Sequence, residues 1–162
     1  MRPRRGAGPI TSARATGTAV NADAYDLDRF VTAQAPHHER VLAEIRSGRK
    51  RSHWMWFVFP QIAGLGHSAM SIHYAIRGLD EARAYLAHPV LGPRLIASCE
   101  AVLSVPDRSA HDIFGSPDDM KLRSCATLFA EATPPGSVFE RVLDRFFGGE
   151  RDERTVAITR GP

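Results

Sequence analysis

The residues best suited to chemistry lie in one short stretch of the chain, residues 52–74. This stretch holds both tryptophans, two phenylalanines, three of the seven histidines and a Gly-Leu-Gly turn. Aromatic rings can stack on a planar ligand, and a histidine can exchange protons near neutral pH. We therefore expect any functional site of this protein to be built from this stretch.

The aromatic residues of this stretch have two interpretations. They are Trp54, Trp56, Phe57 and Phe59. A cluster of this kind can stack a nucleobase, because each ring offers a face that tolerates any base. The same residues are also typical of a hydrophobic core, in which a tryptophan N–H needs a partner such as His53, Gln61 or a backbone carbonyl.

A glycine-rich turn follows the aromatic residues and reads Gly64-Leu65-Gly66-His67-Ser68. It leads into an expected helix, whose free N-terminal amides and dipole favour a phosphate or a carboxylate. On this interpretation Gly66 and Ser68 contact an anion. The alternative is a tight turn between two packed helices, in which Ser68 only caps the second helix.

The histidines of the stretch are candidate general bases, and they are His53, His67 and His73. Their unperturbed pKa suits proton exchange near neutrality, and His53 is the preferred candidate. Their spacing matches no metal motif on one helix, and Cys99 and Cys125 have no partner at metal-site spacing. We therefore predict no metal site and no cofactor, with both cysteines reduced and buried. A surface position or a structural hydrogen bond is the alternative for each histidine.

Further charged candidates open a later helix. Asp118 and Asp119 suit the positive end of the helix dipole, whereas Lys121 opposes it. If this helix meets the aromatic stretch across a cleft, Asp118 supplies a carboxylate for proton transfer and Lys121 a cation for charge stabilisation. Capping by Ser116 and compensation of the dipole explain the two acids equally well.

Helical periodicity and the breaking residues Pro and Gly define the elements that must position these side chains. The expected segments are 26–34, 36–46, 52–57, 69–77, 79–87, 91–102, 109–114, 117–129 and 138–146. Caps are expected at Asp26, Ser52, Ser68 and Ser116. Residues 54–59 would suit a buried strand as well as a helical turn, and we favour the turn because the chain offers no convincing partner strand.

These segments predict an all-α fold, a single domain formed by an irregular bundle of about seven short helices. The domain is expected over residues 23–150. Residues 1–22 are rich in Gly, Pro, Ala, Thr and Arg and are expected to form a disordered basic tail. Residues 151–162 are expected to form a polar C-terminal tail, with an apolar patch able to pack as a final turn.

The charge distribution argues against a nucleic-acid-binding domain. The chain of 162 residues has a formal net charge of +3, but four arginines and no acid lie in residues 1–14, so the rest is slightly negative. No apolar run approaches the length of a membrane span, and residues 1–22 lack the apolar core of a secretory signal. We expect a cytoplasmic protein without membrane or specific nucleic-acid partners.

The aromatic stretch also resembles the most characteristic block of a known family. The matching residues are 53–61, Gly64-Leu65-Gly66, Ser68 and 74–76, followed by Glu81-Ala82, Tyr85-Leu86, His88-Pro89, Leu91-Gly92, Arg94-Leu95, Phe114-Gly115, Asp118, Lys121 and 127–129. They are similar to a widespread bacterial family of unknown function whose members often carry the name calpastatin. The resemblance covers about residues 25–147 and implies an all-α fold, known from a mycobacterial member, but no activity. The helical patterning is unlike a disordered protease inhibitor, so that name implies nothing here.

These observations lead to one main hypothesis and one alternative. The main hypothesis is a small anionic, nucleotide-like ligand bound in an aromatic pocket lined by His53, Trp54, Trp56, Gln61, Gly66, Ser68, Tyr74 and Lys121. It requires His53, Gln61 and Lys121 to converge on one concavity. The alternative is a protein-protein interaction module without catalytic activity, in which the aromatic residues are core and an exposed helix face or the basic tail meets a partner.

Overall fold

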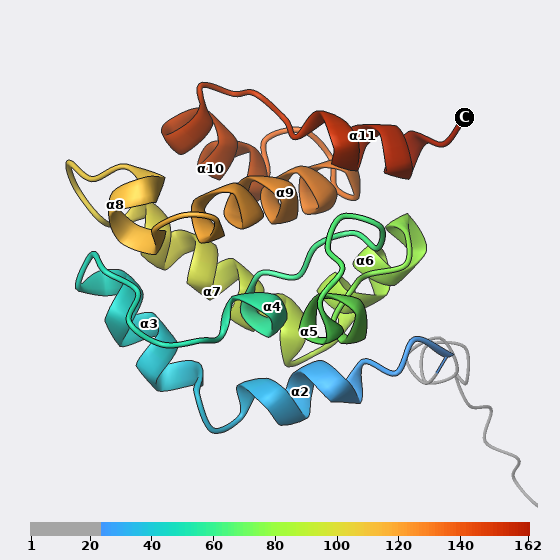
Figure 1. Ribbon diagram of the computed structural model, residues 1–162, viewed down its shortest axis with the longest axis horizontal. Helices are drawn as coiled ribbons and strands as arrows, with labels where there is room; N and C mark the ends of the chain where they lie inside the picture. The colour runs from blue at the N-terminus through green and yellow to red at the C-terminus, as the bar shows by residue number, and fades with distance from the viewer. Residues whose placement is uncertain (1–23) are drawn as a thin grey trace, which may run out of the picture.

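The described part of the protein, residues 24–162 of a computed structural model, is built from helices (Figure 1). It contains ten helices where about seven were expected: each of the nine expected segments holds one helix, and the C-terminal tail adds a tenth. The bounds are α2 Asp28–Gln34, α3 His38–Arg46, α4 Met55–Val58, α5 Ala69–His73, α6 Leu79–Ala87, α7 Leu91–Leu103, α8 Ala110–Phe114, α9 Asp118–Glu131, α10 Val138–Phe147 and α11 Glu153–Arg160. The all-α prediction is confirmed. The basic tail predicted for residues 1–22 lies outside the described residues.

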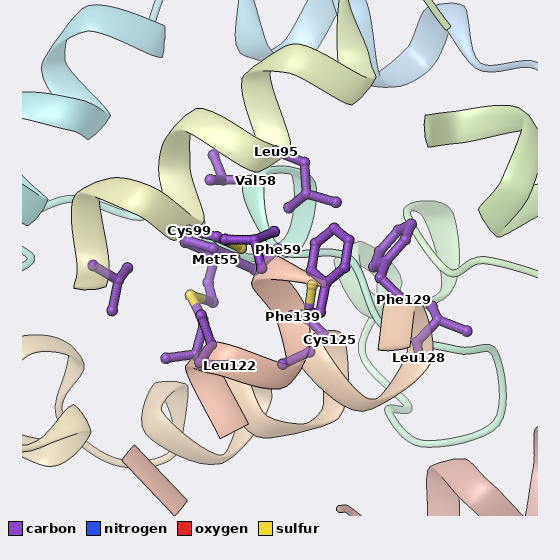
Figure 2. Close-up of a cluster of buried hydrophobic side chains, with 14 of the residues drawn as sticks. Met55, Val58, Phe59, Leu95, Cys99, Leu122, Cys125, Leu128, Phe129 and Phe139 are labelled. Carbon is purple, nitrogen blue, oxygen red and sulfur yellow. The ribbon is translucent and has the colours of Figure 1, made fainter. Parts of the chain in front are cut away.

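Two long helices, α7 and α9, organise the bundle. α7 packs against α3, α6 and α10, and α9 packs against α6, α8, α10 and α11. Figure 2 shows part of the core, where Met55, Val58 and Phe59 meet side chains from α7, α9 and α10. Within residues 54–59, Met55–Val58 form a helical turn, α4, and most of the apolar side chains of the stretch lie in the core.

Both cysteines lie in this core, as the sequence predicted. Cys99 and Cys125 are free thiols, each about 1% exposed. Burial raises the pKa of both thiols, because a thiolate would lose its hydration. They are therefore unreactive packing residues at neutral pH.

The caps were predicted with mixed success. Ser68 caps α5 by accepting a hydrogen bond from the Ser71 amide, as expected. Asp26 and Ser116 cap no helix, because α2 begins after Leu27 and α9 after Pro117. The Ser52 prediction is also wrong, since its hydroxyl donates to Glu44 instead.

A closed loop connects α4 to α6 and carries α5. The Ile76 amide donates to the Gln61 carbonyl at 2.8 Å, and the Ala63 amide donates to the Ile76 carbonyl at 2.7 Å. These two bonds form an isolated parallel bridge between Ile62 and Ile76. α5 therefore ends at His73 and not at Arg77, because the residues beyond it are needed in extended form for this bridge.

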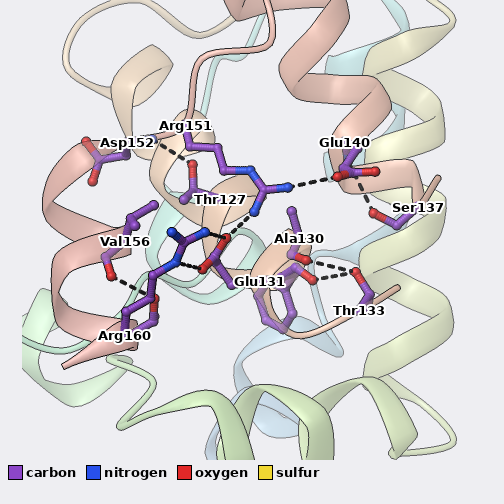
Figure 3. Close-up of polar contacts among 12 residues, drawn as sticks. Thr127, Ala130, Glu131, Thr133, Ser137, Glu140, Arg151, Asp152, Val156 and Arg160 are labelled. Atoms are coloured by element: carbon purple, nitrogen blue, oxygen red, sulfur yellow. Dashed lines mark hydrogen bonds and ion pairs between the residues drawn. The ribbon is translucent and has the colours of Figure 1, made fainter. Parts of the chain in front are cut away.

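The C-terminal segment forms a helix that is attached to the bundle. Asp152 caps α11 through the Thr155 amide, and the Asp152 amide donates to the Thr127 hydroxyl of α9 at 2.9 Å. Arg151 and Arg160 both pair with Glu131 at the end of α9 (Figure 3). These contacts hold α11 against α9.

No helix within residues 24–162 combines the length and the apolar character needed to cross a membrane.

Candidate functional site

The closed loop forms one side of a cavity of about 320 Å³. The cavity is lined by the second tryptophan of the aromatic stretch, by residues of the loop and by α5. These residues are Trp56, Gln61, Ile62, Ala63, Gly64, Gly66, His67, Ser71, Ile72, Tyr74 and Ala75. Two aromatic rings and several polar side chains thus meet at a single concave surface, which is the usual composition of a small-molecule site.

The two tryptophans occupy different environments. Trp54 is about 1% exposed, and its indole N–H donates to the Glu44 carboxylate at 3.0 Å. Trp56 is only partly buried and borders the cavity. Trp54 is therefore a core residue, whereas Trp56 offers a ring to the cavity.

Glu44 explains why Trp54 is fixed in the core. Its carboxylate also accepts hydrogen bonds from the Ser52 hydroxyl and from the amides of Arg51 and Ser52. Burial alone would raise the pKa of the Glu44 carboxyl, but these hydrogen bonds lower it to about 2. The buried charge is thus fully paired and ties the end of α3 to the start of the aromatic stretch.

Three polar side chains of the cavity, by contrast, have no hydrogen-bond partner in the part of the chain that the structure describes. Among residues 24–162, no hydrogen bond joins the Gln61 amide group, the Trp56 indole N–H or the Tyr74 hydroxyl to another residue. Ser71 adds a hydroxyl beside the α5 cap. Buried Gln34 and Tyr85 elsewhere in the fold are satisfied by each other at 2.9 Å. Unpaired donors at a concave surface are available to a ligand.

Neighbouring aromatic rings fix the position of the Tyr74 side chain. Its ring centroid lies 5.5 Å from that of Phe57 and 5.7 Å from that of Phe30 on α2. The His73 ring packs edge-on against it at 4.6 Å. Tyr74 is therefore a preorganised ring of the cavity wall.

The charged candidates of α9 lie near Trp56 but outside the described lining of the cavity. The Lys121 ammonium lies 5.3 Å from the centre of the Trp56 ring. Asp118 pairs with Lys121 at 3.4 Å and with Lys50 at 2.9 Å. The carboxylate is thus held between two ammonium groups, and the group of three has a net positive charge next to Trp56.

The structure brings together four of the predicted ligand-binding residues, Trp56, Gln61, Gly66 and Tyr74. Ser68 is exposed and does not line the cavity. Lys121 reaches the cavity only through its contact with the Trp56 ring, and the Asp118 carboxylate is occupied by lysines. The exposed His53 is not among the lining residues, so His53, Gln61 and Lys121 do not converge on one concavity.

Some residues of the site were not predicted from the sequence as ligand contacts. Ser71 and Ile72 lie on the cavity side of α5, and Lys50 belongs to a basic run before the aromatic stretch. No pattern in the sequence separates Ser71 from the other polar residues near the start of α5. Nothing near Lys50 in the sequence indicates its partner Asp118. His67 lines the cavity and is the histidine best placed to exchange a proton with a ligand.

Within residues 24–162 no group of three or more His, Cys, Asp or Glu side chains is arranged to hold a metal ion. The cavity also lacks a carboxylate among its described lining residues. Its described lining therefore offers neutral polar groups and the His67 ring, and Lys121 lies against Trp56 outside that lining.

Comparisons with known proteins found a matching family and a solved structure with a similar fold. A family model described as a protein of unknown function, DUF1810, matches residues 24–159. The crystal structure of the conserved hypothetical protein Rv1873 from Mycobacterium tuberculosis is 51% identical, with a TM-score of 0.84. The alignment covers 86% of this chain and 100% of that one. No protein with a curated description matches the chain.

Proposed function

This chain belongs to the DUF1810 family of proteins of unknown function, and we propose that it binds a small anionic ligand with a planar ring in the cavity beside α5. The observation that carries the proposal is the meeting of Trp56, Gln61 and Tyr74 around one concave surface with their polar groups unpaired among residues 24–162. Unpaired donors that share a concave surface with aromatic rings suit a ligand that is both flat and polar.

Each part of such a ligand has a complementary feature. A ring can lie against Trp56 or Tyr74, whose faces stack on any planar heterocycle. The Gln61 amide both donates and accepts, so it can bind the edge of that ring. A phosphate or carboxylate is attracted by the Lys121 ammonium, which lies against Trp56.

The proposal makes no claim of catalysis. Asp118 is paired with two lysines and His53 stands in solvent, so neither shares the cavity as a proton-transfer group should. Binding therefore has more support than turnover. A nucleoside monophosphate is a representative ligand, since it combines a planar base with a phosphate.

A thermal-shift screen with nucleoside monophosphates and other phosphorylated metabolites tests the proposal. A ligand present at about ten times its Kd stabilises the folded state by about 1.4 kcal/mol, which raises the Tm by about 3 to 5 °C for a chain of this size. Absence of any shift at millimolar concentration would contradict the proposal.

A charge variant then tests the sign of the ligand. Gln61→Glu is nearly isosteric and places a negative charge in the cavity, so an anionic ligand should bind at least about tenfold more weakly. Ala43→Glu adds the same charge at an exposed position of α3 and serves as the matched control. Unchanged or tighter binding in Gln61→Glu would show that the ligand is not an anion held in this cavity.

Exposed apolar residues on α5 favour the alternative of a protein partner. α5 buries none of its side chains, and Ile72 and Met70 are 65% and 39% exposed. A partner covering this helix would protect Ile72 and close the same cavity from outside. Such a partner would bind equally well to the Gln61→Glu variant if its contacts are with Ile72 and Met70, and this result distinguishes the two functions.

A further inference from the structure

One arginine outside the cavity binds the backbone on both sides of Tyr74. The Arg29 guanidinium of α2 donates from Nε to the His73 carbonyl and from Nη2 to the Ala75 carbonyl, each at 2.8 Å. Its Nη1 atom donates to the carbonyls of Tyr25 and Asp26 at 2.6 and 2.8 Å. A single side chain thus joins the segment before α2 to the end of α5.

The remaining donor of this guanidinium is held by a buried acid. Nη2 also contacts the Glu81 carboxylate of α6 at 2.9 Å, and the Glu81 side chain is fully buried. Glu81 accepts a second hydrogen bond from the Arg77 amide at 3.0 Å. Because the planar guanidinium is fixed by an acid on another helix, it holds the two carbonyls in a defined geometry.

These contacts concern the cavity because Tyr74 lies between the two carbonyls. The Arg29 guanidinium also lies 4.4 Å from the centre of the Phe30 ring, and Phe30 in turn packs on Tyr74. Arg29 therefore holds the backbone beside Tyr74 directly and contacts Phe30, on which the Tyr74 ring packs. Burial of α5 side chains cannot provide this support, since none is buried.

We propose that Arg29 is a positioning residue of the cavity, which sets the place of Tyr74 and of residues 73–75 without touching the ligand. The effect on binding rests on the proposed function, but the hydrogen bonds from Arg29 to residues 73–75 are present in the protein without ligand. Loss of the guanidinium should make residues 73–75 more mobile while leaving the core around α7 and α9 intact. The ligand would then bind more weakly, because part of its binding free energy would be used to order the wall.

Amide hydrogen exchange, measured on the protein without ligand, tests whether Arg29 holds this wall of the cavity in place. Arg29→Lys keeps the charge beside Glu81 but loses the fork that reaches both carbonyls, so amides of residues 61–76 should exchange at least about tenfold faster. Arg145→Lys is the matched control: Arg145 lies 4.6 Å from the centre of the Phe146 ring and donates to the Val105 carbonyl, without contacting the cavity.

Two results would overturn the proposal. One is exchange over residues 61–76 that is no faster in Arg29→Lys than in Arg145→Lys. The other is an equal acceleration in all helices, which would show that Arg29 stabilises the whole fold.

A thermal shift with adenosine monophosphate completes the test. If the wild type responds, the shift should be several-fold smaller in Arg29→Lys. If no compound of the screen shifts the Tm of the wild type while exchange is accelerated locally, the ligand proposal fails and the support of Tyr74 by Arg29 stands.

Discussion

Trp54 and Trp56 are two residues apart in the chain, yet their indole N–H groups have different surroundings. The carboxylate of Glu44 satisfies Trp54, and no described residue satisfies Trp56. A buried donor without a partner costs stability, and the Trp56 N–H avoids this cost because its side chain is only partly buried. At the scale of residues, the hydrogen-bond partner of the indole N–H thus distinguishes Trp54, a structural residue, from Trp56, the functional candidate.

The first prediction concerns Glu44. Glu44→Gln should lower the free energy of unfolding by about 1 to 3 kcal/mol, because an amide cannot accept all the hydrogen bonds that the carboxylate accepts. Chemical denaturation measures the change, and Glu39→Gln, at an exposed position of the same helix, is the control. Equal stability of the two variants would contradict the role of Glu44.

The same residue predicts a pH dependence. The pKa of Glu44 is about 2 in the folded protein against an ordinary value of 4.5, so the carboxylate stabilises the fold above pH 4.5. This contribution is lost as the pH falls from 4.5 towards 2. Glu44→Gln should therefore lose less stability than the wild type over this range, and parallel curves would show that Glu44 titrates without effect.

Sequence reasoning identified the stretch that forms the cavity but not the role of each residue in it. The structure places Trp56, Gln61, Gly66 and Tyr74 around one concave surface, and their role in binding stays a prediction. The assignment of Trp54 to the ligand depended on knowing the partner of its N–H. That partner, Glu44, lies on a preceding helix in a position that helical periodicity alone describes as an ordinary surface acid.

At the scale of elements, the loop between α4 and α6 is fixed at its two ends, whereas its middle, α5, packs little against the rest of the fold. Its ends are joined by the bridge between Ile62 and Ile76, whereas α5 contributes no side chain to the core. Gly66 allows the loop to approach α5 closely: a Cβ atom at this position would lie 2.6 Å from the Ser71 side chain. The shape of the cavity therefore depends on this contact.

Gly66→Ala should push α5 away from the turn. Overpacking of this kind costs about 1 kcal/mol or more, and the binding of adenosine monophosphate should weaken with it. Gly78→Ala is the control, because its backbone is extended and no atom lies within 4 Å of the added methyl group. Equal thermal shifts with the nucleotide in the two variants would show that Gly66 does not shape the site.

The elements themselves were largely predictable, and their exceptions have a physical cause. Proline and glycine set most helix ends, as periodicity indicated. The predicted cap at Ser52 failed because its hydroxyl donates to Glu44 of α3, and the predicted cap at Asp26 failed because α2 begins after Leu27. α5 stops early because the bridge at Ile76 requires extended backbone.

At the scale of the whole molecule, the C-terminal helix links the far end of the chain to the cavity. Arg154 on α11 donates to the Gly64 carbonyl at 3.4 Å, so α11 lies against the loop. Glu131 of α9 holds α11 in place through Arg151 and Arg160, and these hydrogen bonds lower the pKa of the Glu131 carboxyl. The polar composition of residues 151–162 concealed this role, because polar contacts anchor the helix.

Glu131→Gln should release α11. The expected cost is about 1 to 2 kcal/mol, since Glu131 is largely buried while Arg160 is exposed, and exchange should accelerate in residues 153–160 more than in α7. Glu100→Gln breaks a comparable pair with Arg141 in which both side chains are about half exposed, and it should change stability by less than about 0.5 kcal/mol. A similar effect of both variants would contradict the anchoring role.

The central claim is that the ligand occupies the cavity beside Trp56. A titration of the ¹⁵N-labelled protein with adenosine monophosphate tests it most directly, because the indole N–H signals of Trp54 and Trp56 report separately on core and cavity. We predict that the Trp56 indole signal and the amides of residues 61–75 shift progressively, while the Trp54 indole signal stays in place. Unchanged signals at millimolar nucleotide, or shifts confined to another surface, would contradict the account.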